Sequence, residues 1–169
     1  MASVSIVVSA YNEEAKIGDC LKSVTFADEI IVVDNESTDK TVEIAKKYKA
    51  KVTSKPNNKM LNINKNAGIA KAASDWILYL DADERVTKEL QNEIKAILNQ
   101  DSPDVAGYFI PRKNIIFGRW IEYAGMYPDY QMRLFKRGKG KYPEIHVHEM
   151  IDVDGKVAYL QSSLGTPQL

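Results

Sequence analysis

One short stretch near the middle of this 169-residue chain limits most strongly what the chain can fold into. The apolar residues 76–80, Trp-Ile-Leu-Tyr-Leu, end abruptly in Asp81, Asp83 and Glu84. An apolar run of this length predicts a strand that is buried on both faces of a parallel sheet. In open α/β sheets, ligands bind just beyond the carboxyl ends of such strands. We therefore expect these acids to lie at a binding site.

Asp81 and Asp83 are two residues apart, and residues at this spacing in extended backbone point to the same side. Two adjacent carboxylates repel each other unless a positive charge lies between them, and Mg²⁺ or Mn²⁺ prefers such oxygen ligands. The pair therefore indicates a divalent cation as cofactor. The alternative is a solvated acidic turn that caps the next helix, and the pair alone does not decide between the two.

Strand-like and helix-like segments alternate along the first hundred residues. The strand patterns lie at residues 4–9, 29–33, 51–53 and 76–80, and a helix pattern follows each of them. Asn12 is expected to cap the first helix and Thr87 the fourth. This alternation predicts an α/β fold with a mostly parallel central sheet and helices on both faces.

The character of the chain changes after residue 103. Residues 105–110 predict another strand, whereas residues 111–141 are rich in aromatic, glycine and basic residues and suit a binding surface or a loop lid. Residues 151–159 alternate around Asp154-Gly155, which predicts a small C-terminal hairpin. We expect a single domain over residues 1–169, with one half at 1–103, a second half at 104–160 and a disordered tail at 161–169.

The overall composition excludes several classes of protein. Lys plus Arg and Asp plus Glu both number 23, so no strong net field would draw the chain to nucleic acid. Cys20 is the single cysteine, which excludes an internal disulfide and favours a reducing compartment. No apolar stretch approaches the roughly 20 residues of a membrane span, and no basic region precedes the first strand as in a signal peptide. We therefore expect a cytoplasmic protein without a nucleic-acid partner.

Polar residues end three of the predicted parallel strands: Asn12 and Glu13 follow the first, Asp34 the second, and Asp81 and Asp83 the fourth. The carboxyl ends of parallel strands meet at one edge of a sheet, so these side chains are expected to gather there. No G-x-G-x-x-G sequence follows the first strand and no Walker A sequence is present, which disfavours dinucleotide and P-loop sites. A metal ion can neutralise phosphate instead, which fits a nucleotide-diphosphate ligand.

Several motifs now resemble one known family in order and spacing. They are SIVVSAYNEE at residues 5–14, IVVDNESTDKT at 31–41, NAG at 66–68, DWILYLDADE at 75–84, D-x-x-x-RLFKR at 129–137 and VHE at 147–149. Together they resemble the family 2 glycosyltransferases of GT-A fold, and within that family the bacterial lipopolysaccharide-core glucosyltransferase-like proteins. The likeness covers residues 4 to about 150. It implies a Rossmann-like GT-A fold with a nucleotide-binding half at 1–103 and an acceptor-side half at 104–160, and a nucleotide-diphosphate sugar as donor.

The resemblance also implies which residues bind the donor. Ala10, Tyr11 and Glu13 at the first strand end, together with Asp34, would hold the base and the ribose, with Asp34 accepting a hydrogen bond from uracil. Lys65 would approach the diphosphate.

By the same resemblance, Asp81 would support the ribose and the metal site, and Asp83 would bind the metal directly. His148 matches a ligand of the metal or the diphosphate. Asp129, behind a glycine-containing loop at Gly125, falls where the family places its general base. A carboxylate that takes the proton of an attacking hydroxyl typically accelerates a reaction by about 10² to 10⁴.

The residues themselves leave structural alternatives open. Asp34 could cap the next helix, and Asp129 could open a turn after Pro128. Arg133 could clamp a phosphate of the nucleotide or pair with Asp129.

The aromatic and histidine residues of the second half are equally open. Trp120, Tyr123 and Tyr127 could form a platform on which an acceptor sugar stacks, or they could pack a long loop. His146 and His148 share one face of a predicted strand, and a lone histidine is more often structural than a ligand.

The resemblance implies an inverting, metal-dependent hexosyltransferase that acts in cell-envelope or lipopolysaccharide biosynthesis. Its donor would be a nucleotide-diphosphate sugar, by resemblance UDP-linked. Its acceptor would be a hydroxyl of a glycan or glycolipid, which could bring the enzyme to the inner face of a membrane. The alternative is a non-catalytic nucleotide-sugar-binding or scaffolding domain with a degenerate acceptor site.

Overall fold

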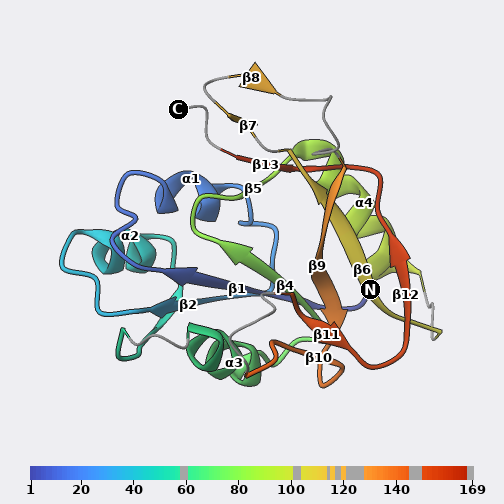
Figure 1. The fold of residues 1–169 in the computed structure, drawn as a ribbon, viewed down its shortest axis with the longest axis horizontal. Coiled ribbons are helices and arrows are strands. Elements are labelled where there is room, and N and C mark those ends of the chain that lie inside the picture. Colours follow the sequence, from blue (N-terminus) through green and yellow to red (C-terminus); the bar gives the residue numbers. More distant parts are fainter. Residues whose placement is uncertain are drawn as a thin grey trace.

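The centre of the fold is a twisted mixed sheet with helices against both of its faces (Figure 1). The computed structural model describes residues 1–57, 61–100, 104–113, 115–116, 119–120, 128–144 and 150–166. The elements of the first half are β1 Val4–Ala10, α1 Ile17–Lys22, β2 Glu29–Asp34, α2 Thr41–Lys47, β3 Lys51–Ser54, α3 Leu61–Lys71, β4 Trp76–Asp81, β5 Arg85–Val86 and α4 Lys88–Asn99. The elements of the second half are β6 Val105–Arg112, β7 Ile115–Ile116, β8 Arg119–Trp120, β9 Asp129–Lys136, β10 Gly140–Lys141, β11 Asp152–Val153, β12 Lys156–Tyr159 and β13 Leu164–Gly165.

The strand order of the main sheet confirms the predicted α/β class. Among the described residues the order is β3-β2-β1-β4-β9-β6-β13-β5, and β12 lies beside β6. The four strands β3, β2, β1 and β4 are parallel to one another, whereas β9 runs antiparallel to β4 and to β6. The helices between the first four strands make this parallel half possible, because a parallel pair needs a crossover connection.

Two hydrophobic layers hold the helices to the sheet. On one face α1, α2 and α4 pack against β1, β2 and β4, and Ile17, Leu21 and Ile94 are fully buried there. On the other face α3 contributes Ile69 and packs with Tyr79 of β4. These layers confirm the predicted helices on both faces. No helix in the described part of the chain is long and apolar enough to cross a membrane.

The beginnings of the helices were predicted with mixed success. Thr87 caps α4 as expected, since its hydroxyl accepts a hydrogen bond from the amide of Leu90 at 3.2 Å. Asn12 does not cap α1, because this helix begins at Ile17 and Asn12 has a left-handed φ of 49°. Its side chain is instead bound to the neighbouring loop, as described below.

The segment expected to be a binding surface or a loop lid contains a central strand. β9 lies between β4 and β6 and buries four consecutive residues, Met132 to Phe135. A strand buried on both faces lacks the alternation of a half-exposed strand, and Arg133 interrupts its apolar run, so its sequence pattern is weak. The prediction of a loop there was wrong over residues 129–136.

The predicted C-terminal hairpin is also wrong in its pairing. Asp154-Gly155 does form a turn, with Gly155 at φ 130°, but the segments on either side do not pair with each other. β11 pairs with β10, and β12 pairs in parallel with β6. The tail expected to be disordered from residue 161 contributes β13, which pairs with β5 and buries Leu164. In both cases, contacts distant in sequence outweigh the local signal.

Gly68 permits the close approach of α3 to the sheet. A Cβ atom at this position would overlap Val33 Cγ2 and lie 2.9 Å from Val7 Cγ1. We therefore expect Gly68→Ala to lower the free energy of unfolding by roughly 1–3 kcal/mol, measured by urea denaturation.

Gly18 provides the matched control for this prediction. A Cβ there would lie 3.7 Å from Ile44 Cγ2, which is an ordinary contact, and alanine favours helix. Gly18→Ala is expected to leave stability unchanged or to raise it. Equal losses in the two variants would contradict the packing argument.

Candidate active site

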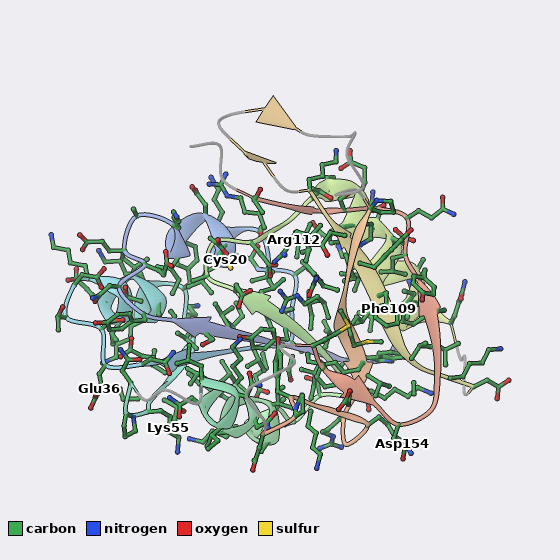
Figure 2. All side chains as sticks on the ribbon, in the orientation of Figure 1. Cys20, Glu36, Lys55, Phe109, Arg112 and Asp154 are labelled. Carbon is green, nitrogen blue, oxygen red and sulfur yellow. The ribbon has the colours of Figure 1, made fainter. Side chains whose placement is uncertain are left out.

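The predicted gathering of strand ends occurs at one edge of the sheet. Ala10 is paired in register with Asp34, and Ser9 with Asp81, so β1, β2 and β4 end at the same level. β6 runs parallel to this group through its β9 neighbour and ends at Arg112 (Figure 2). The residue where β9 begins, Asp129, is in register with Arg112. The candidate base therefore lies at the same edge as the strand-end acids.

Two loops at this edge are bound to each other. Asn12 Oδ1 accepts a hydrogen bond from the amide of Thr38 at 2.8 Å, and the amide of Asn12 donates to Ser37 Oγ at 2.9 Å. The amide of Glu13 donates to Thr41 Oγ1 at 2.8 Å. These bonds fix the backbone after β1 against the backbone after β2. Ala10 is buried beneath them, whereas the side chain of Tyr11 stays 48% exposed and accessible to a ligand.

Asp34 does not cap a helix. The next helix, α2, begins at Thr41, and the buried Asp34 carboxylate accepts a hydrogen bond from the amide of Ser37 at 3.2 Å within the loop. The following Asn35 donates to the carbonyl of Ala10 at 3.2 Å and accepts from Asn64 Nδ2 at 2.7 Å. The end of β2 is thus fixed from both sides.

The backbone after β4 turns instead of remaining extended. The amide of Glu84 donates to the carbonyl of Asp81 at 3.0 Å, which closes a turn over residues 81–84. The strand alternation used to place Asp81 and Asp83 on one side therefore does not apply. The two carboxylates still act on the same neighbour, Glu13. Partial burial in the first place raises the pKa of Glu13, and the charges of Asp83 and Asp81 add to this against the opposing effect of Lys16.

A chain of ion pairs crosses the edge from Asp81 to Asp129. Arg133 Nη2 lies 3.1 Å from Asp81 Oδ2 and 3.0 Å from Glu84 Oε1. Arg112 Nη1 lies 3.7 Å from the same Glu84 oxygen, and Arg112 Nη2 donates to Asp129 Oδ2 at 2.8 Å. Figure 2 labels Arg112 at the end of β6. Two roles were left open for Arg133, a clamp on a phosphate and a partner of Asp129. The ion pairs of Arg133 are with Asp81 and Glu84, and Asp129 pairs with Arg112 instead.

Arg133 and Lys65 are held by aromatic rings below this chain. The Arg133 guanidinium lies 5.3 Å from the centre of the Tyr79 ring and donates to Tyr142 Oη at 3.0 Å. Lys65 Nζ lies 4.8 Å from the centre of the Tyr142 ring. Burial opposes the charge of Arg133, but the Glu84 carboxylate, with Tyr142 and Asp81, outweighs burial and raises the pKa of Arg133. The Arg133 guanidinium therefore stays charged at the site.

Hydrogen bonds from α3 fix Tyr142 in turn. Asn66 Nδ2 donates to the carbonyl of Tyr142, and the amide of Tyr142 donates to Asn66 Oδ1, both at 2.8 Å. Asn62 Nδ2 donates to the carbonyl of Pro143 at 2.8 Å. The NAG segment, noted in the sequence only as part of a motif, thus attaches the second half of the chain to the first.

Several candidate residues lie outside the described part of the chain. They are His146, His148, Tyr123, Gly125 and Tyr127, together with the side chain of Trp120. Within the described residues no group of three or more His, Cys, Asp or Glu side chains could hold a metal by itself. A cation at Asp81 and Asp83 would therefore draw further ligands from a bound nucleotide or from residues beyond this set.

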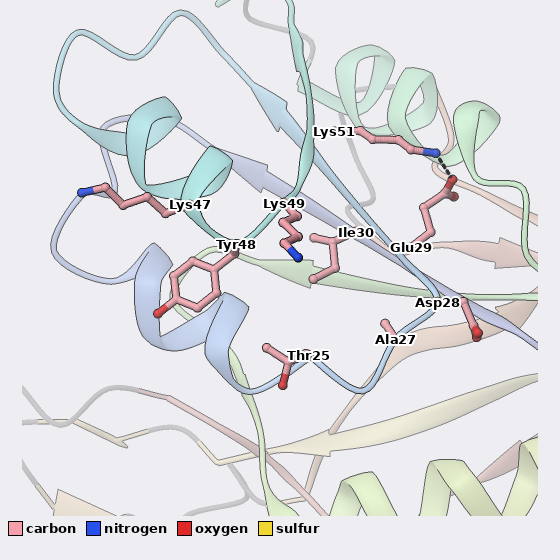
Figure 3. Close-up of a pocket in the computed structure, with 9 residues that line it drawn as sticks. All are labelled: Thr25, Ala27, Asp28, Glu29, Ile30, Lys47, Tyr48, Lys49 and Lys51. Carbon is pink, nitrogen blue, oxygen red and sulfur yellow. Dashed lines mark hydrogen bonds and ion pairs between the residues drawn. The ribbon is translucent and has the colours of Figure 1, made fainter.

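A cavity of about 520 Å³ lies at the opposite edge of the sheet (Figure 3). It is bordered by Asp28 and Glu29 at the start of β2 and by Lys49 and Lys51 near β3. Lys51 Nζ is paired there with Glu29 Oε2 at 2.8 Å. None of the predicted site residues borders this cavity, so it is not part of the candidate active site.

Sequence reasoning missed the roles of Glu84, Arg112 and Tyr142. Arg112 lies two residues beyond the predicted strand 105–110, so the rule that ligands lie at strand ends could have included it. Glu84 was noted only as a third acid, and its burial depends on arginines far away in the sequence. For Tyr142 the sequence offers no comparable signal.

The sequence of this chain is similar to those of known proteins. The family model described as glycosyl transferase family 2 matches residues 5–164. An uncharacterised glycosyltransferase of Rickettsia typhi is 43% identical over 105 residues, which cover 62% of this chain and 36% of that protein. The lipopolysaccharide core biosynthesis glycosyltransferase LpsC of Rhizobium meliloti is 28% identical over 91% of this chain and 58% of its own length. The chain thus spans about one third to three fifths of these relatives.

Solved structures show the same fold. The crystal structure of TarS 1–349 from S. aureus has a TM-score of 0.73 at 19% identity and covers 97% of this chain and 60% of its own. Glucosyl-3-phosphoglycerate synthase of Mycobacterium tuberculosis, in complex with Mn²⁺, UDP and glucosyl-3-phosphoglycerate, has a TM-score of 0.52 at 24% identity over 63% of this chain and 43% of its own. At these identities the likeness concerns the fold.

Proposed function

Because the chain belongs to glycosyl transferase family 2, we propose that it transfers a hexose from a UDP-sugar to a hydroxyl of a cell-envelope glycan or glycolipid, with inversion at the anomeric carbon. One observation carries this proposal. The strand-end acids expected to bind donor and metal, and the separate carboxylate Asp129 expected to act as base, lie at one edge of the sheet. LpsC, a relative that acts in lipopolysaccharide core biosynthesis, supports the class of acceptor.

Inversion requires the acceptor hydroxyl to attack the anomeric carbon from the side opposite the departing diphosphate. In the proposed mechanism Asp129 takes the hydroxyl proton during this attack. The cationic side chains of Lys65 and Arg133 stabilise the negative charge that builds on the diphosphate. Asp34 accepts a hydrogen bond from the uracil base, and Tyr11 lies exposed where it can contact the nucleoside.

The residues at the end of β4 fit a hard divalent cation. Asp83 is half-buried and receives no hydrogen bond from the described residues, and the Asp81 side chain keeps 38% exposure. Carboxylate oxygens are the ligands that Mg²⁺ and Mn²⁺ prefer. When bound there, the cation would offset charge on the leaving diphosphate. The Mn²⁺ in the mycobacterial synthase structure supports this choice of cofactor.

A thermal-shift titration tests the donor and the cofactor. At a ligand concentration of 100 times Kd, binding stabilises the folded state by about 2.7 kcal/mol. For a domain of this size, that corresponds to a rise in Tm of roughly 5–10 °C with UDP-glucose and Mn²⁺. EDTA should remove most of the rise, and Asp83→Asn should remove the part that depends on Mn²⁺.

Release of UDP from the same donors separates an enzyme from a binding domain. Turnover supports the transferase. A Tm rise without any turnover over a panel of glycan acceptors would favour the alternative, a nucleotide-sugar-binding domain. No Tm rise with any UDP- or GDP-sugar would contradict both.

A further inference from the structure

The ion-pair chain between Asp81 and Asp129 joins the two sides of the proposed reaction. Its order is Asp81–Arg133–Glu84–Arg112–Asp129, so that carboxylate and guanidinium groups alternate. We propose that Arg112 is a positioning residue for Asp129. Glu84 in turn fixes the position of Arg112 relative to the turn at residues 81–84, which would hold the donor. This inference rests on the proposed function, because it assumes that Asp129 is the base.

The contact between Arg112 and Asp129 fixes the orientation of the carboxylate. Arg112 Nε and Nη2 donate to the same oxygen, Asp129 Oδ2, at 3.2 and 2.8 Å. Gln131 Nε2 donates to the other oxygen, Oδ1, at 2.9 Å. Three hydrogen bonds from two directions leave the carboxylate little freedom to rotate. A general base must be oriented in this way, because its carboxylate oxygen can take the hydroxyl proton only when it points toward that proton.

Glu84 serves both arginines at once. Its side chain is 1% exposed, and its Oε1 lies 3.0 Å from Arg133 and 3.7 Å from Arg112, while Oε2 accepts from the amide of Asp81 at 2.9 Å. The amide bond fixes Glu84 to the turn that carries Asp81 and Asp83. Glu84 therefore fixes the position of Arg112 relative to the loop that would hold the donor, and Arg112 fixes the position of Asp129 in the same way.

The geometry of Arg133 shows that this arrangement constrains the side chain strongly. Its Nη1 and Nη2 groups bind Tyr142, Asp81 and Glu84, but its buried Nε has no hydrogen-bond partner among the described residues. Buried donors without a partner are rare because burial removes the hydrogen bond that they would make to water and nothing replaces it. The orientation of the guanidinium is thus set by its two carboxylates and not by the best use of its own donors.

A purely structural role of the same ion pairs would also hold β6, β9 and β4 together. The two possibilities differ in one measurable property, the kcat of the folded enzyme. In both cases the loss of Arg112 changes the titration of Asp129, because a neighbouring cation favours the charged form of a carboxylate. If Arg112 positions Asp129 as the base, kcat falls as well, whereas loss of a purely structural ion pair lowers stability and leaves kcat of the folded enzyme unchanged.

The test combines carboxyl NMR with kinetics on Arg112→Gln, Arg112→Lys and the control Arg137→Gln. Arg137 follows β9 at the end of the strand opposite Asp129, where its amide donates to the carbonyl of Asp75. Arg137→Gln therefore removes the same charge at a position away from the site. In protein labelled with ¹³C-carboxyl aspartate, the titration midpoint of Asp129 should rise by about one pH unit in Arg112→Gln. It should stay close to wild type in Arg112→Lys and Arg137→Gln.

The kinetic arm uses UDP release from UDP-glucose with Mn²⁺. In Arg112→Gln we expect kcat to fall at least tenfold, with the KM for the donor changed less than about twofold. An unmoved Asp129 midpoint, or a moved midpoint with unchanged kcat, would overturn the proposal. The NMR arm does not need turnover. If wild-type protein neither binds nor turns over any nucleotide sugar, the proposed function fails independently of that arm.

Discussion

Asp129→Asn is expected to lower the rate of sugar transfer by about 10² to 10⁴ while the affinity for UDP and Mn²⁺ stays within a few-fold of wild type. The substitution keeps the size of the side chain and removes its ability to accept a proton. The nucleotide should be unaffected, because the predicted donor contacts come from the ends of β1, β2 and β4, from Lys65 in α3 and from Arg133, and Asp129 itself is not among them. Initial rates of UDP release and titration calorimetry with UDP would measure the two effects separately.

Asp154→Asn provides the control for this prediction. Asp154 lies in the exposed turn before β12, far from the ion-pair chain in the fold (Figure 2), and its amide donates to the carbonyl of Lys139. The same change of formal charge there should leave the rate within about twofold of wild type, since surface substitutions away from such features have small effects. Full activity of Asp129→Asn would exclude Asp129 as the base, and equal losses in the two variants would indicate a general effect of charge.

The parallel half of the fold could be predicted because its signals are local. The run 76–80 and the earlier strands are each short and apolar, and the helices between them show their buried residues at helical spacing, as Leu90, Ile94 and Ile97 do in α4. Strand ends then lie at one edge by the geometry of parallel sheets alone. This is why the structure brings together strand ends that are far apart in the sequence, Ala10, Asp34 and Asp81.

The antiparallel half could not be predicted in the same way. β9 pairs with β4 from more than fifty residues away, and its buried segment contains Arg133, which any hydropathy pattern counts as exposed. The burial of this arginine is possible only because Glu84, 49 residues earlier, and Asp81 neutralise it. A sequence shows each charge but not the pairing that allows it to be buried.

The residues of the candidate site likewise divide into those that could be predicted from the sequence and those that could not. The identities of Asp34, Asp81, Asp83 and Asp129 came from strand ends and from the family resemblance, and whether they bind and catalyse as proposed stays a prediction. The residues between them were missed. Asn35 and Asn64 fix the end of β2 through a 2.7 Å hydrogen bond that no motif in the sequence indicates. Polar residues of this kind can be recognised only after the fold has placed them next to each other.

Glu84→Gln is expected to lower the free energy of unfolding by about 3–5 kcal/mol, which is the usual cost of removing one partner from a buried ion pair. Glutamine keeps the shape of the side chain, but it leaves the buried Arg133 with Asp81 as its remaining carboxylate. Its amide group also offers donors where both arginines require acceptors. Since domains of this kind are stable by only 5–15 kcal/mol, the loss should be plain in urea denaturation.

Two further variants separate burial from simple loss of charge. Glu43→Gln removes an exposed carboxylate that pairs with Lys47 at 3.3 Å one helical turn away, and it should cost no more than about 0.5 kcal/mol. The double variant Glu84→Gln/Arg133→Gln should cost less than the sum of its two single changes, because it removes both deeply buried charges, and Asp81 and Arg112, which lose a partner, are partly exposed to solvent. Strict additivity, or a cost at Glu84 no larger than at Glu43, would show that the carboxylate is not the shared counterion of the two arginines.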